Sequence, residues 1–319
     1  MIIVKSPLRI SLFGGSTDYE DFYSKHGSFL IGAAINKHAY LSVRYRSKIL
    51  SKESVITYSK TDIVTHWSQI QNPLIRKTLE FVNIKKAIDF NSFSDMPART
   101  GLGGSSSFCV GLLKALYLLE GYEWDKKKIA RDAIHVERRL LLEAGGIQDQ
   151  LWASYGGLNS IEIDKFGNWH IKPLPVTDEF REKLEQSIFL IYTNDQRNQD
   201  TIAKSHENKD KGCILDISKS AYQFFLNEDI EGIGKLLYES WKAKMNISDS
   251  ISTDKINDIV RRVMELGAFG TKLLGAGGCG FVLVIADGKA KQRIKEEFME
   301  NLLEIEFDFQ GATQIYPII

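Results

Sequence analysis

A glycine-rich turn followed by three serines is the part of this sequence best suited to hold a phosphate group. The run PARTGLGGSSS occupies residues 97–107 and leads into an apolar, helix-like segment at 108–119. Glycines let the backbone approach an anion closely, and the free N–H groups and positive dipole end of a helix favour negative charge. The run therefore predicts a phosphate cradle, with the alternative that Ser105 or Ser106 merely caps a core helix.

Two acidic residues belong to a later segment in which a helical pattern ends at two glycines. Glu137 lies within the helical part, and Gln148 and Asp149 follow the glycines. Phosphoryl transfer needs a divalent ion held by hard oxygen ligands and a base or orienting group beside the attacking hydroxyl. Ser105 and Glu137 could hold the metal while Asp149 acts on the hydroxyl. Glu143 competes for the metal role, unless it only forms a surface ion pair.

A third polar segment lies near the N-terminus, where PLRISLFGGSTDY at 7–19 leads from a strand into a glycine turn. The turn presents Ser16, Thr17 and Asp18. Short polar side chains on a tight turn suit a polyhydroxylated ligand, because a carboxylate can accept hydrogen bonds from two adjacent sugar hydroxyls. The alternative is that Asp18 only caps a helix beginning at Tyr19.

A second glycine cluster, GAGGCG at 275–280, formally satisfies the dinucleotide-binding pattern G-x-G-x-x-G. That fingerprint follows a strand and opens a helix, whereas this cluster runs into the strand-like segment 281–285, so we reject a Rossmann interpretation. The P-loop pattern is absent, as are H-E-x-x-H, paired C-x-x-C and G-x-S-x-G. The motifs typical of zinc hydrolases and serine hydrolases are therefore missing, which disfavours both classes.

Composition narrows the class of protein further. Lysine and arginine total 41 and balance 41 acidic residues, so no overall field attracts nucleic acid or an anionic membrane. The three cysteines lack paired spacing, no apolar run approaches the length of a membrane span, and the N-terminus has no signal-peptide pattern. We expect a cytoplasmic protein without nucleic-acid or membrane partners. Its oligomeric state is not readable.

The order of the expected elements predicts an α+β fold of two domains, 1–178 and 179–319. Strand patterns occupy 2–4, 39–45, 54–58, 87–93, 152–163, 169–175, 188–192 and 281–285. Helical patterns occupy 108–119, 126–142, 216–227, 230–244 and 254–266, the last after a possible cap at Thr253. A charged helix and a final strand end the chain.

Taken together and in order, the motifs at 7–19, 97–107 and 272–280 resemble those of the GHMP kinases, a family that includes galactokinase, homoserine kinase and mevalonate kinase. The resemblance implies an N-terminal domain with a left-handed βαβ feature, a ferredoxin-like C-terminal domain, and ATP and Mg²⁺ as cofactors. It implies an ATP-binding segment of Pro97, Arg99, Gly101, Leu102, Gly103, Gly104, Ser105, Ser106 and Ser107. Ser105 and Glu137 would hold Mg²⁺, Asp149 would be the base, and Arg9 would stabilise charge beside it.

The same resemblance implies a sugar acceptor bound by Arg9, Ser16, Thr17, Asp18, Gln148, Asp149, Gly277 and Gly278. Galactokinases have an acidic residue and a histidine where this chain has Gly15 and Ser16, and many members have serine at the position of Gly104, so the sugar contacts differ from those of galactokinase. In detail the motifs are most similar to those of bacterial D-glycero-D-manno-heptose 7-phosphate kinases. These phosphorylate the anomeric hydroxyl, giving the 1,7-bisphosphate for nucleotide-activated heptose and surface polysaccharide.

Two alternatives remain at this stage. One is a kinase of the same family that acts on an unphosphorylated hexose such as fucose or galactose, and the other is a sugar-sensing protein without turnover. A substrate that already carries a 7-phosphate needs basic residues at its far end. Five candidates qualify, and the sequence does not choose among them: Lys37, Arg46, Arg99, Arg197 and Lys244.

Overall fold

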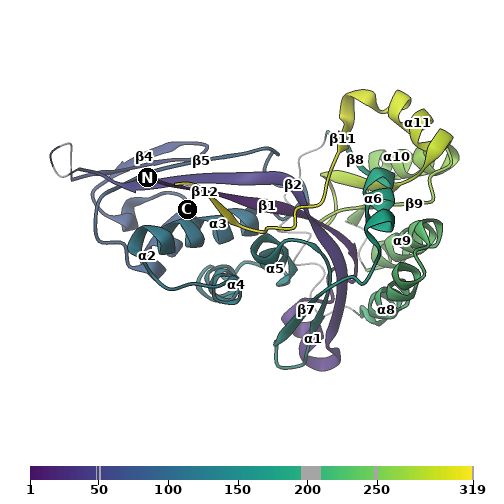
Figure 1. The fold of residues 1–319 in the computed structure, drawn as a ribbon, viewed down its shortest axis with the longest axis horizontal. Coiled ribbons are helices and arrows are strands. Elements are labelled where there is room, and N and C mark those ends of the chain that lie inside the picture. The colour runs from purple at the N-terminus through teal and green to yellow at the C-terminus, as the bar shows by residue number, and fades with distance from the viewer. Residues whose placement is uncertain (48, 50–51, 195–209, 248–250, 318–319) are drawn as a thin grey trace.

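The computed structural model describes residues 1–47, 49, 52–194, 210–247 and 251–317. It contains two β-sheets, each with helices packed on it. Figure 1 shows the larger sheet with its helices on the left and the smaller sheet with its helices on the right. Strands and helices are grouped, and do not alternate regularly. The predicted two-domain α+β fold is therefore confirmed.

The larger sheet contains eight strands among the described residues: β1 (Ile2–Phe13), β2 (Ser28–Tyr45), β3 (Ser54–Thr57), β4 (Thr61–Val64), β5 (Ile88–Ser94), β6 (Leu158–Ile163), β7 (Trp169–Pro173) and β12 (Thr313–Tyr316). Their order is β12-β1-β2-β5-β3-β4, and β6 pairs with β2 and with β7. Pairing is antiparallel except between β3 and β5. A short helix, α1 (Glu20–His26), connects β1 to β2.

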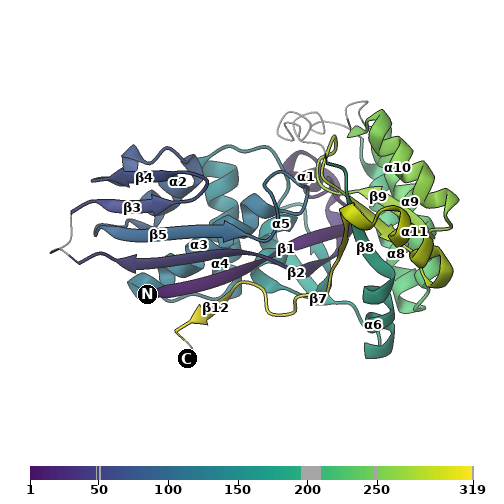
Figure 2. The same ribbon diagram turned by 90° about the horizontal axis from the view of Figure 1, so that it is seen from above.

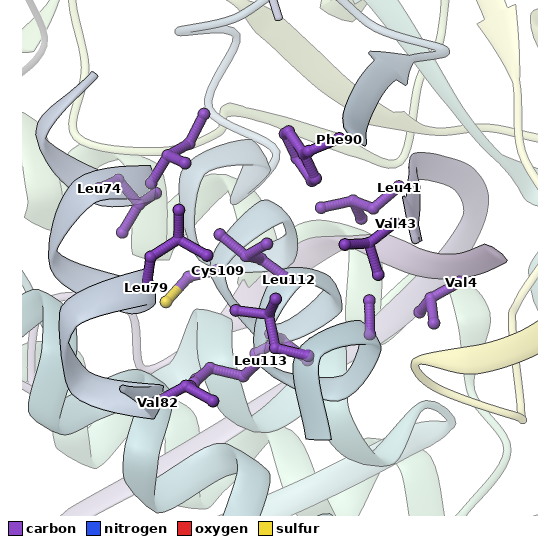
Figure 3. Close-up of a cluster of buried hydrophobic side chains, with 14 of the residues drawn as sticks. Val4, Leu41, Val43, Leu74, Leu79, Val82, Phe90, Cys109, Leu112 and Leu113 are labelled. Atoms are coloured by element: carbon purple, nitrogen blue, oxygen red, sulfur yellow. The ribbon is translucent and has the colours of Figure 1, made fainter. Parts of the chain in front are cut away.

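Helices cover one face of this sheet, as Figures 1 and 2 show. They are α2 (Pro73–Val82), α3 (Gly104–Glu120), α4 (Lys126–His135) and α5 (Gln148–Tyr155). In α3, Leu112 and Leu113 pack among Val4 of β1 and Leu41 and Val43 of β2 (Figure 3). Burying one such side chain stabilises the fold by about 1.5–3 kcal/mol. The packing fixes α3 on the sheet, and with it the glycine run at its N-terminus.

The smaller sheet contains the strands β8 (Ile188–Tyr192), β9 (Gly270–Leu273), β10 (Phe281–Ile285) and β11 (Leu302–Glu304), in the order β11-β8-β10-β9. Its helices are α6 (Asp178–Ser187), α8 (Gly212–Leu226), α9 (Ile230–Met245), α10 (Asp254–Glu265) and α11 (Gly288–Glu297). The predicted cap of α10 is confirmed, because the Thr253 side chain accepts a hydrogen bond from the Ile256 amide. Among the described residues, every helix is too short or too polar to span a membrane.

Some predicted elements were wrong in detail. β1 continues through Pro7 to Phe13, far beyond the predicted 2–4, because both its edges are paired over part of its length. The predicted strand at 152–163 starts as the end of α5, since its aromatic and apolar residues there are buried in a helix. The predicted helix at 126–142 is α-helical only as far as His135, and a π-helical turn, η2 (Val136–Leu140), follows it. Short 3₁₀ turns occur at Trp67–Gln69 and Met299–Asn301.

The last strand also corrects the assignment of 179–319 to a second domain. β12 pairs with β1 through Ile3↔Tyr316 and Lys5↔Thr313, so this part of the chain returns to the larger sheet. The two ends of the described chain lie side by side in Figures 1 and 2. The predicted boundary at 178 coincides with the start of α6 and stays a prediction.

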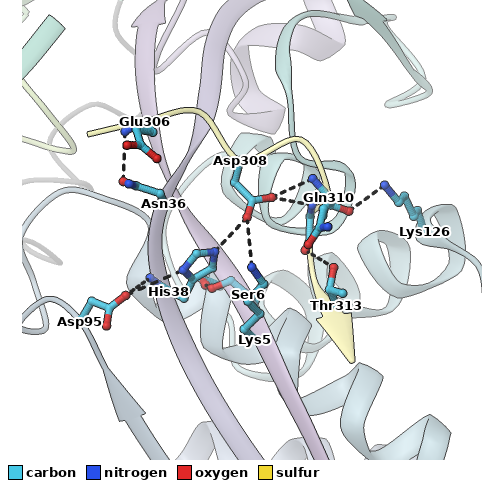
Figure 4. Close-up of polar contacts among 12 residues, drawn as sticks. Lys5, Ser6, Asn36, His38, Asp95, Lys126, Glu306, Asp308, Gln310 and Thr313 are labelled. Carbon is cyan, nitrogen blue, oxygen red and sulfur yellow. Dashed lines mark hydrogen bonds and ion pairs between the residues drawn. The ribbon is translucent and has the colours of Figure 1, made fainter. Parts of the chain in front are cut away.

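A polar network around the buried Asp308 carboxylate holds the returning segment in place (Figure 4). The Asp308 carboxylate lies 2.9 Å from His38 Nε2 and accepts hydrogen bonds from the Gln310 and Gly311 amides at 2.8 and 2.9 Å. Lys126 donates to the Gln310 carbonyl at 2.9 Å. Burial alone would raise the pKa of Asp308, but the hydrogen bonds from His38 and the two amides outweigh it and lower that pKa below its usual value.

This lowered pKa predicts acid sensitivity of the returning segment. A carboxyl group whose folded pKa lies below its unfolded value stabilises the fold above about pH 4 and loses that contribution as pH falls through the folded pKa. We expect Asp308→Asn to lower the free energy of unfolding by about 1–3 kcal/mol at pH 7, and by less at pH 3. Urea unfolding at both pH values measures this. An equal loss at pH 3 and pH 7 would contradict the electrostatic role.

Candidate functional site

A cavity lies where β1, the glycine run before α3 and the segment before α5 meet α9 and β9 of the smaller sheet's layer. Successive side chains of β1 between Leu8 and Leu12 point alternately into the core and into the cavity. Leu8, Ile10 and Leu12 are buried in a core cluster shared with the C-terminal half, whereas Arg9 and Ser11 line the cavity. The same strand therefore joins the two halves and supplies polar groups to the space between them.

An arginine–carboxylate pair lies in this cavity. Arg9 Nε and Nη2 donate to the two oxygens of Asp149 at 2.8 and 2.9 Å, and Arg9 Nη1 donates to the Gly101 carbonyl at 2.6 Å. The Arg9 side chain is only 6% exposed, whereas Asp149 keeps 22%. A bidentate pair fixes the direction of both groups. Asp149 is thus held at the first turn of α5 with part of its carboxylate facing the cavity.

The glycine run passes directly beside this pair. Gly103 has φ +74°, and a Cβ there would lie 3.2 Å from Arg9 Cγ and 3.3 Å from Asp149 Oδ2. Gly103 is also the N-cap of α3 and makes no side-chain cap bond, so the alternative that a serine merely caps this helix is wrong. The helix N-terminus presents backbone N–H groups to the cavity, which suits an anion.

The structure separates the predicted phosphate-binding residues into two groups. Those that line the cavity are Arg99, Gly101, Gly103, Gly104, Ser105 and Ser106. Three others lie elsewhere: Leu102 is buried in the core, the Ser107 hydroxyl donates to the Ser6 carbonyl at 2.8 Å, and Pro97 is exposed outside the cavity. The side chains of these three residues do not line the cavity, and their predicted part in ATP binding stays a prediction.

Glu137 lies in the π-helical turn η2 and is buried beside α3. One carboxylate oxygen accepts a hydrogen bond from the Ser106 hydroxyl at 3.1 Å, and the other accepts one from Gln150 Nε2 at 2.5 Å. Burial raises the pKa of Glu137, and the positive charge of Arg138 is the largest opposing influence. Ser105 is exposed and lines the same cavity, so Ser106 is the serine in contact with Glu137, in place of the predicted Ser105.

These residues fit a magnesium ion. Among the described residues, no group of three His, Cys, Asp or Glu side chains could hold a metal. A magnesium ion needs no such cage, because it takes one or two protein oxygens and completes its shell with substrate phosphates and water. Glu137, Ser106 and Ser105 supply hard oxygen donors next to the helix N-terminus. A cation would also offset the cost of burying the Glu137 charge.

Asp18 is held by contacts within the protein, and its predicted contact with sugar hydroxyls stays a prediction. It is fully buried, and its two oxygens accept hydrogen bonds from the Gln148 amide at 3.0 Å and from Gln148 Nε2 at 3.1 Å. The helix α1 begins after Tyr19 without a side-chain cap, so the alternative in which Asp18 caps it is wrong. Asp18 does not line the cavity, and burial raises its pKa. It holds the first turn of α5, the helix that carries Asp149.

The other residues predicted to bind the acceptor also fall into two groups, those that line the cavity and those that do not. Ser16 and Gln148 line the cavity, whereas Thr17 is buried and its hydroxyl donates to the Gly14 carbonyl at 2.6 Å. Gly277 and Gly278 are buried outside the cavity, where the Gly278 amide donates to the Ile251 carbonyl at 2.8 Å, and their predicted substrate contact stays a prediction. Two neighbours in the same cluster, Gly275 and Ala276, line the cavity in their place.

The five basic residues considered for contact with a 7-phosphate also differ in position. Arg99 and Lys244 line the cavity, Arg46 pairs with Asp89 at 3.1 Å on the larger sheet, and Lys37 lies outside the cavity. Arg197 lies outside the described residues.

Sequence reasoning missed several residues that line the cavity: Ser11, Tyr19, Thr100, Arg138, Ser240 and Lys272. Ser11 could have been found, since it lies two residues after Arg9 on one strand and must share its face. Its hydroxyl is buried without a hydrogen-bond partner, as is Gln148 Oε1.

The contact between Gly146 and Asp18 makes a testable prediction. A Cβ at Gly146 would lie 1.8 Å from Asp18 Oδ2, closer than any real contact. We expect Gly146→Ala to displace Asp18, release the first turn of α5 and lower any turnover that depends on Asp149 by about 10- to 100-fold, with a lower Tm. If the clash is the cause, the same change costs much less in an Asp18→Ala background. Additive losses in the double variant would contradict this.

Known protein families match both halves of the chain. The model for the N-terminal domain of GHMP kinases matches residues 72–157, and the model for the C-terminal domain matches residues 221–302. The first region contains the glycine run and the Arg9 partner Asp149, and the second contains Lys244 and the second glycine cluster.

Individual relatives agree with this result. The chain is 28% identical to D-glycero-alpha-D-manno-heptose 7-phosphate kinase of Campylobacter jejuni, over 92% of this chain and 91% of that protein. It is 32% identical to mevalonate kinase of Methanocaldococcus jannaschii, over 72% of both chains. A crystal structure described as a D-glycero-D-manno-heptose 1-phosphate kinase from Bacteroides thetaiotaomicron superposes with a TM-score of 0.81, 22% identity and full coverage of both chains, which shows a shared fold. Both domain models, in chain order and on the predicted fold, identify this chain as a member of the GHMP kinase family.

Proposed function

We propose that this chain is an ATP-dependent sugar kinase that phosphorylates the anomeric hydroxyl of D-glycero-D-manno-heptose 7-phosphate to the 1,7-bisphosphate. The observation that carries the proposal is the Arg9–Asp149 pair, held beside the glycine run and within the same cavity as Glu137 and Ser106. A carboxylate for the acceptor, N–H groups for the donor phosphates and oxygens for a cation thus share one space. The similarity to the Campylobacter jejuni heptose phosphate kinase supports this choice of acceptor.

In the proposed reaction, Asp149 orients the sugar 1-hydroxyl and accepts its proton as the oxygen attacks the γ-phosphate of ATP. Arg9 holds the Asp149 carboxylate in that direction and places positive charge beside the transferred group. The N–H groups before α3 bind the donor phosphates. Glu137, Ser106 and Ser105 would hold Mg²⁺, which neutralises phosphate charge when bound.

The acceptor's hydroxyls would meet neutral polar groups. The Ser11 hydroxyl and Gln148 Oε1 are buried without partners among the described residues, and Ser16 lines the same cavity. A Cβ at Gly15 would lie 3.1 Å from Ser11 Oγ, so the glycine keeps the space beside that hydroxyl open. Ser11 and Gln148 would each gain a hydrogen bond from a bound sugar.

A substrate panel tests the proposal. Purified protein with ATP and Mg²⁺ is offered heptose 7-phosphate, fucose, galactose and mannose 6-phosphate, with ADP release and ³¹P NMR of the product as readouts. We expect turnover with heptose 7-phosphate and an anomeric phosphate in the product. Turnover only with a free hexose would favour the alternative sugar kinase. Tight sugar binding without ADP release would favour a sensor.

A further inference from the structure

Two buried lysines from the C-terminal half line the same cavity as the Arg9–Asp149 pair. Lys244 belongs to α9 and is 7% exposed, and its ammonium donates to the Gly275 carbonyl. Lys272 belongs to β9 and is 5% exposed, and its ammonium donates to the Leu12 carbonyl at 2.9 Å. An ammonium has three N–H donors, so each lysine keeps donors for a ligand after this one contact.

The grouping of these cations is unfavourable without an anion. Among the described residues, neither lysine forms an ion pair with a carboxylate within 4.0 Å, and Asp149 is already paired with Arg9. Burial, followed by the charge of Arg9, lowers the pKa of Lys244 to about 8. Burial also lowers the pKa of Lys272, and the charges of Lys244 and Arg9 lower it further. Three positive groups that repel one another line one cavity, and in the described part of the chain only Arg9 is paired with a carboxylate, so the cavity favours a negatively charged ligand.

The position of the lysines indicates which ligand carries that charge. Lys272 donates to the Leu12 carbonyl, and the strand ends one residue later and leads to Gly15 and Ser16, which line the cavity. The Asp18 carboxylate, to which Gln148 donates, opposes burial and Arg9 and acts to raise the pKa of Lys244, so the two groups interact. The donor phosphates already have their own partners, namely the N–H groups before α3 and the cation site at Glu137. The lysines therefore belong with the acceptor.

We propose that Lys244 and Lys272 form the subsite for a phosphate group that the acceptor already carries, so that the cavity selects sugar phosphates over free sugars. This inference rests on the proposed function, since it assumes that the acceptor binds in this cavity beside Asp149. Two ammonium groups at one phosphate provide charge-assisted hydrogen bonds. Such contacts change binding of the phosphorylated sugar and leave binding of the free sugar nearly unchanged.

The test compares Lys244→Met with a matched control on the same helix. Lys242→Met makes the identical change at an exposed lysine that pairs with Glu239 on the surface. For each variant, KM and kcat are measured with heptose 7-phosphate, with the same heptose without its phosphate, and with ATP. We expect Lys244→Met to raise KM for heptose 7-phosphate by about 10- to 100-fold, with KM for free heptose and for ATP within about twofold of wild type. Lys242→Met should match the wild type throughout.

Three results would overturn the inference. KM for both sugars could rise equally in Lys244→Met, KM for ATP could rise instead, or the variant could match Lys242→Met. If Lys272→Met lowers Tm sharply because it loses the Leu12 contact, Lys272→Arg keeps the charge and is expected to retain the preference for the phosphorylated sugar. Failure of the proposed function is distinct, because the wild type itself would then not turn over heptose 7-phosphate. In that case calorimetric titration with mannose 6-phosphate and with mannose tests the preference for a phosphorylated sugar. Equal affinity for the two sugars would overturn the inference.

Discussion

Replacing Asp149 with asparagine is expected to lower kcat by about 10²- to 10⁴-fold while leaving the fold intact. The amide cannot accept the proton of the attacking hydroxyl at neutral pH. It can still accept one hydrogen bond from Arg9, which keeps its contact with the Gly101 carbonyl in any case. The variant protein should therefore bind ATP about as well as the wild type. Turnover by ADP release, ATP affinity by calorimetry and Tm together measure these expectations.

Retention of the fold matters for this result, since Arg9 also joins β1 to the glycine run. Arg9→Lys is the informative companion, because lysine keeps the charge but cannot form the bidentate pair with Asp149. We expect it to lower kcat less than Asp149→Asn does. Near-normal turnover in Asp149→Asn would exclude this carboxylate as the base.

The second large effect is expected for Glu137→Gln. Glutamine fills the same space and can still accept the Ser106 hydrogen bond, but it carries no charge for a cation. We expect kcat to fall by about 100-fold or more at ordinary Mg²⁺ concentrations, with half-maximal activity shifted to higher Mg²⁺. Burial penalises the charge of Glu137 in the free protein, so the variant should be at least as stable as the wild type to heat.

Glu143→Gln is the matched control for Glu137→Gln. Glu143 also lines the cavity and was the alternative metal ligand, but it is exposed. We expect this variant to keep the wild-type dependence on Mg²⁺. A shift in the Mg²⁺ requirement for Glu143→Gln, with none for Glu137→Gln, would reverse the assignment.

Much of the fold could be predicted because its signals are local. The apolar helix at 108–119, the strands at 188–192 and 281–285 and the Thr253 cap all follow from periodicity and capping chemistry within a few residues. Residues 152–155 were predicted as a strand, since a short apolar and aromatic run suits a buried strand or a buried helix equally well. Only contact with the sheet and with α3 settles that choice.

For the site, the sequence predicts which segments come together, but not the direction in which each side chain points. Arg9 and Asp149 come together as predicted, because the motifs that contain them meet at the glycine run. Ser105 and Ser106 are equivalent in composition, and only the start of α3 decides that Ser106 turns inward to Glu137. The sequence does not show that Gln148 donates a hydrogen bond to each oxygen of Asp18. Such choices depend on contacts between residues distant in the sequence.

The pairing of β1 with β12 has a consequence for how the protein is made. β1 is synthesised early and finds one neighbour in β2 soon afterwards, but its other edge waits for a strand at 313–316. Until then the growing chain exposes an unpaired strand edge, which can template pairing with other chains. Joining residues so far apart also slows folding. We expect chains released before residue 313 to aggregate, even though the residues proposed for catalysis have all been made by then.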